Sequence, residues 1–295
     1  MTHCLKSPVI ESALQNNLGC TKVLNVKNVG GGCINEGYCY ETDKGPFFVK
    51  QNKQQSIGIF DAEVHGLEDL HKTGAIRVPI PYCCGTLCRT GGSYVIMEYI
   101  PFGKPKEGSQ ALFGEQLANL HAIHTESRFG YFMDNTLGST PQTNSWSDDW
   151  VDFFIKHRLQ FQIDLAEVSI EDGTLKQYGY KLLDKCSRFF EGVAIRPSLI
   201  HGDLWKGNFA VDKEGTPVVF DPAPYFAHHE AELSIMDMFG GFSEEFYQAY
   251  HARIPKAAGF EERQLIYKLY HYLNHLNLFG SSYYPSCISI LKKLV

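Results

Sequence analysis

Hydrophobic and polar residues follow two periods in this chain, one typical of strands near its start and one typical of helices beyond it. The runs over 23–29 and 38–42 predict two strands, and a turn over 43–45 leads into a third strand that ends near Lys50. The apolar run over 94–100 predicts another strand, which is bounded by a Pro and a Gly. The first third of the chain is therefore expected to form a small antiparallel sheet.

Helical spacing prevails beside this sheet and in the rest of the chain. Residues 8–18 predict one helix, and a helix of about 12 residues is expected from Phe60. Further helices are expected over 110–124, 149–168, 175–190, 231–250 and 260–279. In the last of these, five residues share a face that we expect to be core: Leu265, Leu269, Tyr272, Leu276 and Phe279. The pattern predicts an α+β fold with an N-terminal lobe over 1–103 and a larger, mainly helical lobe over 104–295.

Composition and charge narrow the class of protein. A content of 44% hydrophobic and 20% charged residues in a chain of 295 is typical of a globular protein. The net charge of -6 argues against nucleic acid as a partner, because nucleic acid binds a basic face. The sequence has no apolar run of about 18 residues, so no membrane span is expected, and its N-terminus lacks the apolar core of a secretory signal.

Nine cysteines are scattered along the chain. Secreted proteins built on disulfides are usually much shorter and carry cysteine at higher density. Cys83, Cys84 and Cys88 lie close together, but no second Cys or His pair follows at the spacing of a zinc site. We therefore interpret these three as loop and core thiols, and we expect a reducing, cytoplasmic setting.

The strongest chemical signal is the run over 199–222. Asp203 precedes Asn208 by five positions, and an apolar strand then ends at Asp221. In kinases, an Asp accepts the proton of the substrate hydroxyl, an Asn five residues later binds magnesium, and a further Asp at a strand end binds the metal as well. The run therefore predicts a phosphotransferase with Asp203 as the base and with Asn208 and Asp221 as metal ligands.

Two charged residues upstream complete this set. Lys50 stands at the end of a predicted strand, where a kinase places the lysine that contacts the phosphates of the nucleotide. In kinases a Glu on the following helix pairs with this lysine and holds it toward the nucleotide. Glu63, in the first turns of the helix that begins at Phe60, is the expected partner, and Glu68 is the alternative.

A glycine-rich turn separates the first two predicted strands and consists of Gly30, Gly31, Gly32, Cys33 and Ile34. Glycines let backbone N–H groups approach phosphates closely, because no Cβ intervenes. A tight hairpin explains three glycines equally well, but the spacing to Lys50 favours an ATP-binding turn. Cys33 is either a small tolerated residue or a redox switch, whose oxidation would displace the turn from ATP.

Two further segments indicate how the nucleotide would bind and which class of acceptor is expected. Met97, Glu98 and Tyr99 end a buried strand and would form a hinge whose backbone bonds the adenine edge of ATP. After Asp221 the sequence reads Asp-Pro-Ala-Pro rather than Asp-Phe-Gly, and no Ala-Pro-Glu follows. Since protein kinases bind polypeptides through that segment, a small-molecule acceptor is favoured.

With these residues in hand, the chain resembles the fructosamine kinases, or ketosamine kinases, which share the kinase-like fold with aminoglycoside phosphotransferases. The resemblance covers nearly the whole length. It rests on GGGCINEGYCYETDKGPFFVK, TPQTNSWSDDWVDFFIKHRLQ, HGDLWKGN, FDPAPYFAHHEAELSIMDMFGGF and YHYLNHLNLFG. It implies a two-lobed protein-kinase-like fold and ATP-dependent phosphorylation of the 3-hydroxyl of a ketosamine, which destabilises the adduct in protein deglycation.

The resemblance also implies roles for individual residues on the nucleotide side. Asp203 would be the catalytic base, and Asn208 with Asp221 would hold Mg²⁺. Lys50 would contact the α and β phosphates, and residues 30–34 would cover the triphosphate.

On the acceptor side the resemblance implies that Trp205 lines the sugar pocket, together with His201. A packed indole that anchors the loop is the alternative interpretation of Trp205. Lys206 departs from the family pattern HGDLWSGN, in which Ser is expected at this position. This departure leaves the base and the metal ligands intact, but the effect of the lysine on the phosphate side of the site stays open.

Two other functions stay open at the level of sequence. A related kinase for an aminoglycoside, choline or another alcohol would favour an acidic acceptor pocket, which Glu230, Glu232 and Asp237 could supply. A catalytically silent ATP-binding protein would usually have lost the base or the metal ligands, and here all of them are present. The protein would be a monomer or a homodimer, and a disulfide through Cys33 is one way to link two copies.

Overall fold

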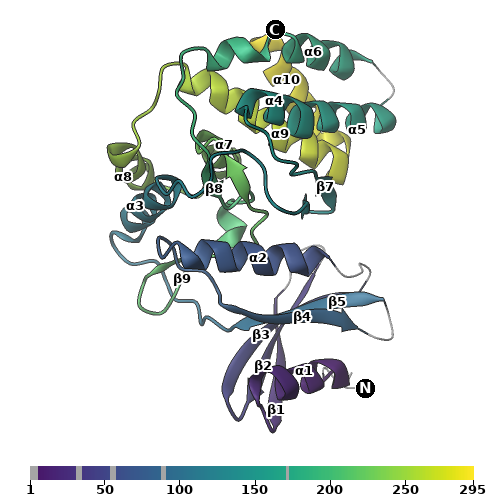
Figure 1. Ribbon diagram of the computed structural model, residues 1–295, viewed down its shortest axis with the longest axis vertical. Coiled ribbons are helices and arrows are strands. Elements are labelled where there is room, and N and C mark those ends of the chain that lie inside the picture. Colours follow the sequence, from purple (N-terminus) through teal and green to yellow (C-terminus); the bar gives the residue numbers. More distant parts are fainter. Residues whose placement is uncertain (1–5, 31–34, 54–57, 88–90, 171–172) are drawn as a thin grey trace.

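Five antiparallel strands and two helices form the first part of the protein, seen here in a computed structural model that describes residues 6–30, 35–53, 58–87, 91–170 and 173–295 (Figure 1). The strand order is β1-β2-β3-β5-β4. The strands are β1 (Val23–Gly30), β2 (Glu36–Thr42), β3 (Gly45–Asn52), β4 (Pro81–Leu87) and β5 (Gly92–Glu98), and the helices are α1 (Pro8–Leu18) and α2 (Ile59–Lys72).

The two faces of the sheet pack against different helices, because side chains alternate along a strand. In β5, Tyr94 and Ile96 join a hydrophobic cluster with Ile10 of α1. Val95 and Met97 point the other way and join the main core with residues of α2. The sheet is therefore covered on both faces, and α2 lies between it and the helical part of the molecule (Figure 1).

The remainder of the chain is mainly helical. Its helices are α3 (Ser109–His121), α4 (Trp150–Phe154), a π-helical segment (Ile155–Gln160), α5 (Phe161–Ser169), α6 (Thr174–Leu183), α7 (Glu230–Met238), α8 (Glu244–Arg253), α9 (Phe260–Phe279) and α10 (Tyr284–Leu294). Short strands form three antiparallel pairs: β6 (Asn135–Leu137) with β7 (Thr140–Gln142), β8 (Ser198–Ile200) with β11 (Tyr225–Ala227), and β9 (Phe209–Val211) with β10 (Pro217–Val219). The predicted α+β fold is confirmed, with a small sheet followed by a larger helical part.

Several element boundaries differ from the sequence prediction. The single helix expected over 231–250 is two helices, because Gly240 and Gly241 adopt φ values of 65° and 99° between α7 and α8. The helix expected over 175–190 ends at Leu183 and continues only as a 3₁₀ turn. Strand β4 and helix α10 were not predicted, since β4 carries two cysteines and a glycine rather than an apolar run.

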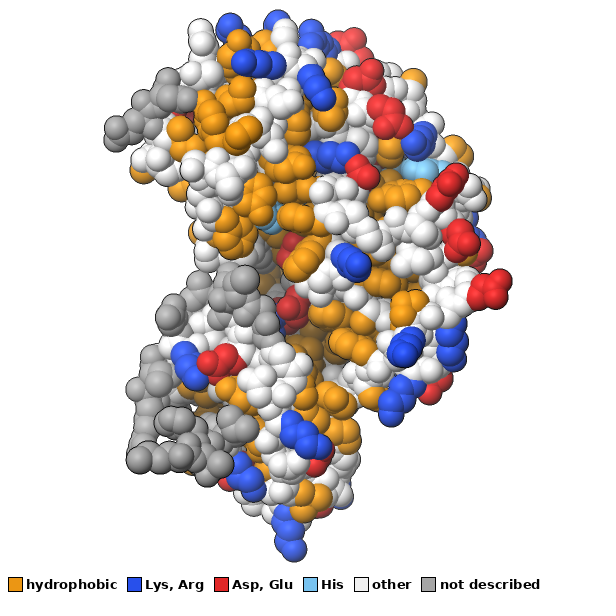
Figure 2. All heavy atoms as spheres, turned by 180° about the vertical axis from the view of Figure 1, so that it is seen from behind, with side chains coloured by type: hydrophobic (Ala, Val, Ile, Leu, Met, Phe, Trp, Pro, Cys, Tyr) orange, Lys and Arg blue, Asp and Glu red, His pale blue; other side chains and the backbone are white. Residues whose placement is uncertain are grey.

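The cleft lies where the sheet and α2 face the helical part. Seen from behind, the surface is hollowed between the two parts, and acidic side chains lie in this hollow (Figure 2). The chain crosses from the sheet near Gly103, whose N–H donates to the carbonyl of Val211 at 2.8 Å. Among the described helices, none has both the length and the apolar character that crossing a bilayer requires.

Candidate active site

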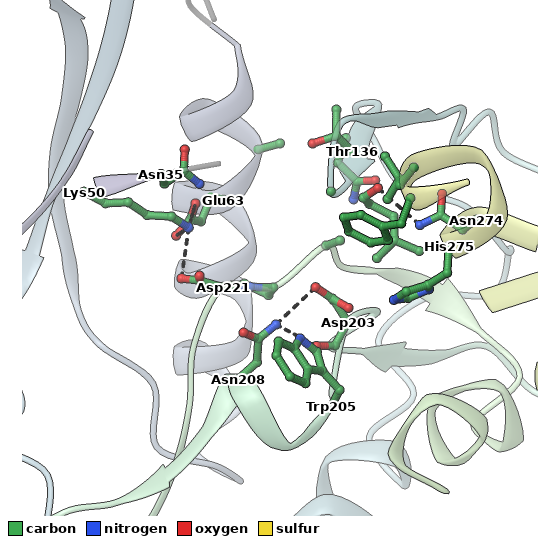
Figure 3. A pocket seen from close by; sticks show the side chains of 18 residues that line it. Asn35, Lys50, Glu63, Thr136, Asp203, Trp205, Asn208, Asp221, Asn274 and His275 are labelled. Carbon is green, nitrogen blue, oxygen red and sulfur yellow. Dashed lines mark hydrogen bonds and ion pairs between the residues drawn. The ribbon is translucent and has the colours of Figure 1, made fainter. Parts of the chain in front are cut away.

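Two adjoining pockets lie in the cleft, and five residues line both of them: Asn35, Lys50, Trp205, Asn208 and Asp221. The smaller, of about 260 Å³, also contains Asp203, and we call it the Asp203 pocket (Figure 3). The larger, of about 630 Å³, extends along the end of β5, and we call it the Met97 pocket. The five residues that line both pockets lie where the two pockets meet.

Lys50 lies at the centre of a buried group of charges. Its ammonium lies 2.8 Å from a carboxylate oxygen of Glu63 on α2 and 2.9 Å from one of Asp221 (Figure 3). Burial alone would lower the pKa of Lys50, but the carboxylates of Asp221 and Glu63 outweigh it and raise this pKa above its ordinary value. The predicted pair of Lys50 with Glu63 is therefore confirmed, whereas the half-buried Glu68 lies near His65.

For Glu63, burial outweighs the neighbouring charge in setting the pKa. It is only 7% exposed, and this burial raises its pKa to about 7, although the nearby ammonium of Lys50 opposes the rise. The carboxylates of Glu63 and Asp221 thus both contact the ammonium of Lys50. Such an arrangement fixes the direction of the Lys50 side chain into the cleft.

Asp221 follows strand β10 and turns sharply into the cleft. Its φ of 59° is the only positive value of a non-glycine residue within the described part of the chain. An Asp tolerates this conformation better than most residues, because its short side chain can bond locally. Here the turn brings one carboxylate oxygen against Lys50, and a strained backbone of this kind is typical of functional sites.

Asp203 stands in the loop that follows β8, on the helical side of the cleft. The side-chain amide of Asn208 donates to its backbone carbonyl at 2.8 Å and to its carboxylate at 3.1 Å (Figure 3). Burial, together with the negative charges of Asp221 and Glu232, raises the pKa of Asp203 well above its ordinary value. A carboxylate with a raised pKa is better matched to accepting a proton near neutral pH.

The structure corrects the prediction for His201. Its side chain is buried and lines neither pocket. One ring nitrogen, Nε2, donates to the carbonyl of Phe220 at 3.0 Å, which leaves Nδ1 to accept the backbone N–H of Asp203 at 3.3 Å. His201 therefore positions the loop of Asp203 from behind and does not line a sugar pocket.

Glu232 of α7 anchors the same loop. Its buried carboxylate accepts the backbone N–H groups of His201 and Gly202. The other acids that an acidic acceptor pocket would need are engaged elsewhere, since Glu230 pairs with Arg263 at 2.7 Å and Asp237 pairs with Lys268. None of these three acids lines either pocket, so they do not give either one the acidic lining considered from the sequence.

The oxygen atoms of Asn208 and Asp221 suit a hard divalent cation. Because the Asn208 amide nitrogen is committed to Asp203, its carbonyl oxygen is left for another partner. One carboxylate oxygen of Asp221 contacts Lys50 and the other is left for another partner, and the side chain is 40% exposed. The donor set and its place between the pockets fit Mg²⁺ as predicted from the sequence.

The predicted hinge lies along the Met97 pocket. Met97, Glu98 and Tyr99 line it together with Phe102. The Glu98 carboxylate accepts from the Arg77 guanidinium at 2.6 Å, and this ion pair ties it to the chain segment before β4. Of the glycine-rich turn, Gly30 lines this pocket, whereas Gly31, Gly32, Cys33 and Ile34 lie outside the described residues.

Trp205 lines both pockets and is 40% exposed. Gly207 lets the indole lie close to the backbone, because a Cβ at this position would be 2.2 Å from the ring. The ring packs on its own loop, as one of the two interpretations expects, and it also faces the cleft, while its contact with a sugar stays a prediction.

Several pocket residues were not predicted from the sequence. The Asp203 pocket is closed by the β6–β7 hairpin through Asn135 and Thr136, and by α9 through Asn274 and His275 (Figure 3). Phe279 also lines it and is 54% exposed, so its assignment to the core is wrong. The signal that could have found the α9 residues is the adjacent Asn and His within a helix whose apolar period predicts a core face.

The sequence as a whole matches known proteins. A family model described as "Fructosamine kinase" matches residues 7–295. The protein-ribulosamine 3-kinase, chloroplastic, of Arabidopsis thaliana is 48% identical over 272 residues, which cover 92% of this chain and 82% of that protein. The ketosamine-3-kinase of Mus musculus is 38% identical, and the match covers 97% of this chain and 99% of that protein.

Solved structures agree with this assignment. A crystal structure assigned as a fructosamine-3-kinase from Haemophilus somnus 129PT superposes with a TM-score of 0.86 at 27% identity, covering 97% of this chain and 96% of the other. The aminoglycoside phosphotransferase APH(4)-Ia shares the kinase-like fold, with a TM-score of 0.65 at 15% identity, covering 96% of this chain and 98% of the other. The chain belongs to the fructosamine kinase family.

Proposed function

We propose that this protein transfers the γ-phosphoryl group of ATP to the 3-hydroxyl of a ketosamine sugar and so acts in protein deglycation. One observation carries the proposal. Asp203, Lys50, Asn208 and Asp221 all line one cleft, and the last three lie where its two pockets meet. The names of the Arabidopsis and mouse relatives, a ribulosamine 3-kinase and a ketosamine-3-kinase, support the acceptor class.

Asp203 acts as the general base. The acceptor hydroxyl would lie in the Asp203 pocket, and its proton would pass to the carboxylate as the oxygen attacks phosphorus. The raised pKa of Asp203 makes the carboxylate a stronger base than an exposed Asp. The amide of Asn208 holds the carboxylate in place, so its direction is set before the acceptor binds.

The Met97 pocket takes the nucleotide. The backbone of Met97, Glu98 and Tyr99 would bond the adenine edge, and Lys50 would contact the α and β phosphates. Because Glu63 fixes the Lys50 side chain, the ammonium points to the place where the two pockets meet. The turn over 30–34 would cover the triphosphate, as expected from the sequence.

Asn208 and Asp221 would hold Mg²⁺ through their free oxygens. When bound, the ion neutralises charge on the phosphate oxygens during transfer. The amide nitrogen of Asn208 donates to Asp203 and one oxygen of Asp221 contacts Lys50, so the other oxygen of each side chain is left for the ion. The contact with Lys50 also keeps Asp221 turned into the cleft.

The predicted redox switch at Cys33 and the cytoplasmic setting remain part of this proposal. Oxidation of Cys33 would displace the phosphate-covering turn and lower activity. Assays of the wild type and of Cys33→Ser, each after diamide and after dithiothreitol, test this step. Equal activity of the wild type under both treatments would contradict the switch, and the oligomeric state can be read from the same samples by light scattering.

The acceptor is identified best by competition within a mixture. Wild-type protein, ATP and Mg²⁺ are incubated with a glycated lysine peptide, an aminoglycoside and choline, and the products are identified by mass spectrometry. We expect phosphate on the ketosamine sugar, with fragmentation that places it on the 3-hydroxyl. Phosphate on the aminoglycoside or choline alone would favour the related small-molecule kinases, and no ADP release with any acceptor would favour a silent ATP-binding protein.

A further inference from the structure

Five rings form a continuous row at the side of the Asp203 pocket that is remote from the sheet. The ring centroids of Trp205 and Phe239 are 5.8 Å apart, those of Phe239 and His275 are 5.0 Å apart, and those of His275 and Phe279 are 5.5 Å apart. Tyr283 completes the row at 5.2 Å from His275. We call these five residues the aromatic rim.

The rim is exposed although it is largely apolar. The exposed fractions of Trp205, Phe239 and Phe279 are 40%, 41% and 54%, and none of these three rings belongs to the two hydrophobic clusters of the fold. Scattered exposed apolar residues are ordinary, but contiguous ones at the edge of a pocket mark a binding surface. Three of the five rim residues also line the Asp203 pocket, so the rim continues it outward.

His275 gives the rim one polar atom with a defined role. Its Nδ1 is 2.8 Å from the carbonyl oxygen of His271, which can only accept, so the hydrogen of the neutral ring lies on Nδ1. Burial lowers the pKa of His275 and keeps the ring neutral. Within the described residues Nε2 has no hydrogen-bond partner, and the ring lies on the Asp203 side of the pocket (Figure 3).

We propose that the aromatic rim is a subsite for the amine-bearing arm of the acceptor and favours an alkyl arm such as a lysine side chain. The inference rests on the proposed function, in which the sugar hydroxyl lies at Asp203. The amine of a ketosamine is joined near that hydroxyl and is protonated at neutral pH. Its cation and alkyl chain suit aromatic faces, and its N–H group suits the Nε2 lone pair of His275.

The test compares two acceptors that carry the same ketose sugar. In one the sugar is joined to the ε-amine of a lysine in a short peptide, and in the other to methylamine. Phe239→Ala and Phe279→Ala should each lower kcat/KM for the lysine acceptor by about two- to fivefold, the scale of one methylene group that loses its apolar contact. Phe239 lines neither pocket, so in Phe239→Ala the methylamine acceptor, which has the same amine but no alkyl arm, should change by less than about twofold.

Phe132→Ala is the matched control, because Phe132 is 56% exposed and lines neither pocket. It should leave kcat/KM for both acceptors unchanged. Phe279→Tyr keeps the ring face and should keep the preference for the lysine acceptor, which separates lost binding from altered folding. Equal losses for both acceptors in Phe239→Ala, or no loss for either acceptor in both alanine variants, would overturn the subsite.

Failure of the subsite and failure of the proposed function give different results. If the function is wrong, the wild type phosphorylates neither ketosamine, and the comparison of variants never arises. If the function is right and the subsite is wrong, the wild type phosphorylates both acceptors, and the rim variants retain the wild-type ratio of kcat/KM between them.

Discussion

On the sheet side of the cleft, the ammonium of Lys50 lies within 3 Å of carboxylates from Glu63 and Asp221. On the helical side, the hydrogen-bond donor to the carboxylate of Asp203 is the neutral amide of Asn208. Two carboxylates keep the ammonium of Lys50 charged, which suits binding of anionic groups, whereas Asp203, whose carboxylate is held by a neutral amide, has a raised pKa and can exchange a proton. In the proposed function, the cleft therefore separates binding of the nucleotide from proton transfer.

The largest effect is expected for the proton acceptor. Asp203→Ala removes the proposed general base and should lower kcat by about 10²–10⁴-fold. The affinity for ATP, measured by calorimetry, should stay near that of the wild type, because the ion pairs of Lys50 lie on the other side. Turnover of a ketosamine at the wild-type rate by this variant would show that the division between the two sides is wrong.

On the sheet side, removal of the ion pairs of Lys50 should mainly lower the stability of the fold. Lys50→Met leaves the buried Glu63 without its cation and should lower the free energy of unfolding by about 3 kcal/mol. Lys53→Met is the matched control, since Lys53 pairs with Glu36 at the same distance of 2.8 Å but on the surface. Its cost should be less than about 1 kcal/mol. Urea unfolding measures both, and equal losses would contradict the special status of Lys50.

A smaller effect is expected where the loop supports Trp205. In Gly207→Ala the new Cβ would lie 2.2 Å from the indole, so the ring must move out of its place between the pockets. We expect KM for the acceptor to rise about tenfold, on the scale of one lost aromatic contact. Steady-state kinetics with each substrate varied in turn checks this. A change in KM for ATP alone would place the indole on the nucleotide side of the comparison.

The raised pKa of Asp203 also predicts how stability depends on pH. Because the folded protein binds this proton more tightly than the unfolded chain, the wild type loses stability as pH rises from the ordinary Asp value to the raised one. Asp203→Asn lacks this ionisation and should be more stable than the wild type at pH 7.5, by about 1 kcal/mol. The two should converge near pH 3, as thermal unfolding at both pH values can test.

The two sides also differ in how far the sequence predicts them. The charged and amide groups of both sides follow from short motifs whose spacing is fixed by a strand end or a tight loop, Lys50 and Asp221 on the sheet side and Asp203 with Asn208 on the helical side. The pairing of Lys50 with Glu63 needed only the phase of one helix, which the apolar period supplies.

The acceptor side is assembled from segments far apart in the sequence. Asn135 and His275 approach Asp203 only because a hairpin and α9 pack over the loop, and no local pattern encodes that packing. Phe279 follows the apolar period of α9 and was therefore assigned to the core, although its ring lies at the pocket. His201 belongs to the motif, yet its role depends on the carbonyl of Phe220, which the sequence does not place.

The smallest effect is expected for Lys206, the residue that departs from the family pattern. Its exposed side chain lies over Gly241, where a Cβ would be 2.4 Å from Lys206 Cδ, and it lines neither pocket. Lys206→Ser should therefore change kcat and both KM values by less than about twofold, as expected for a surface substitution. The pH profile of kcat is the sharper measurement, because a lysine that compensated Asp203 would lower the pKa of the base. An acid limb that moves to higher pH in Lys206→Ser would show that the helical side also has its own cation.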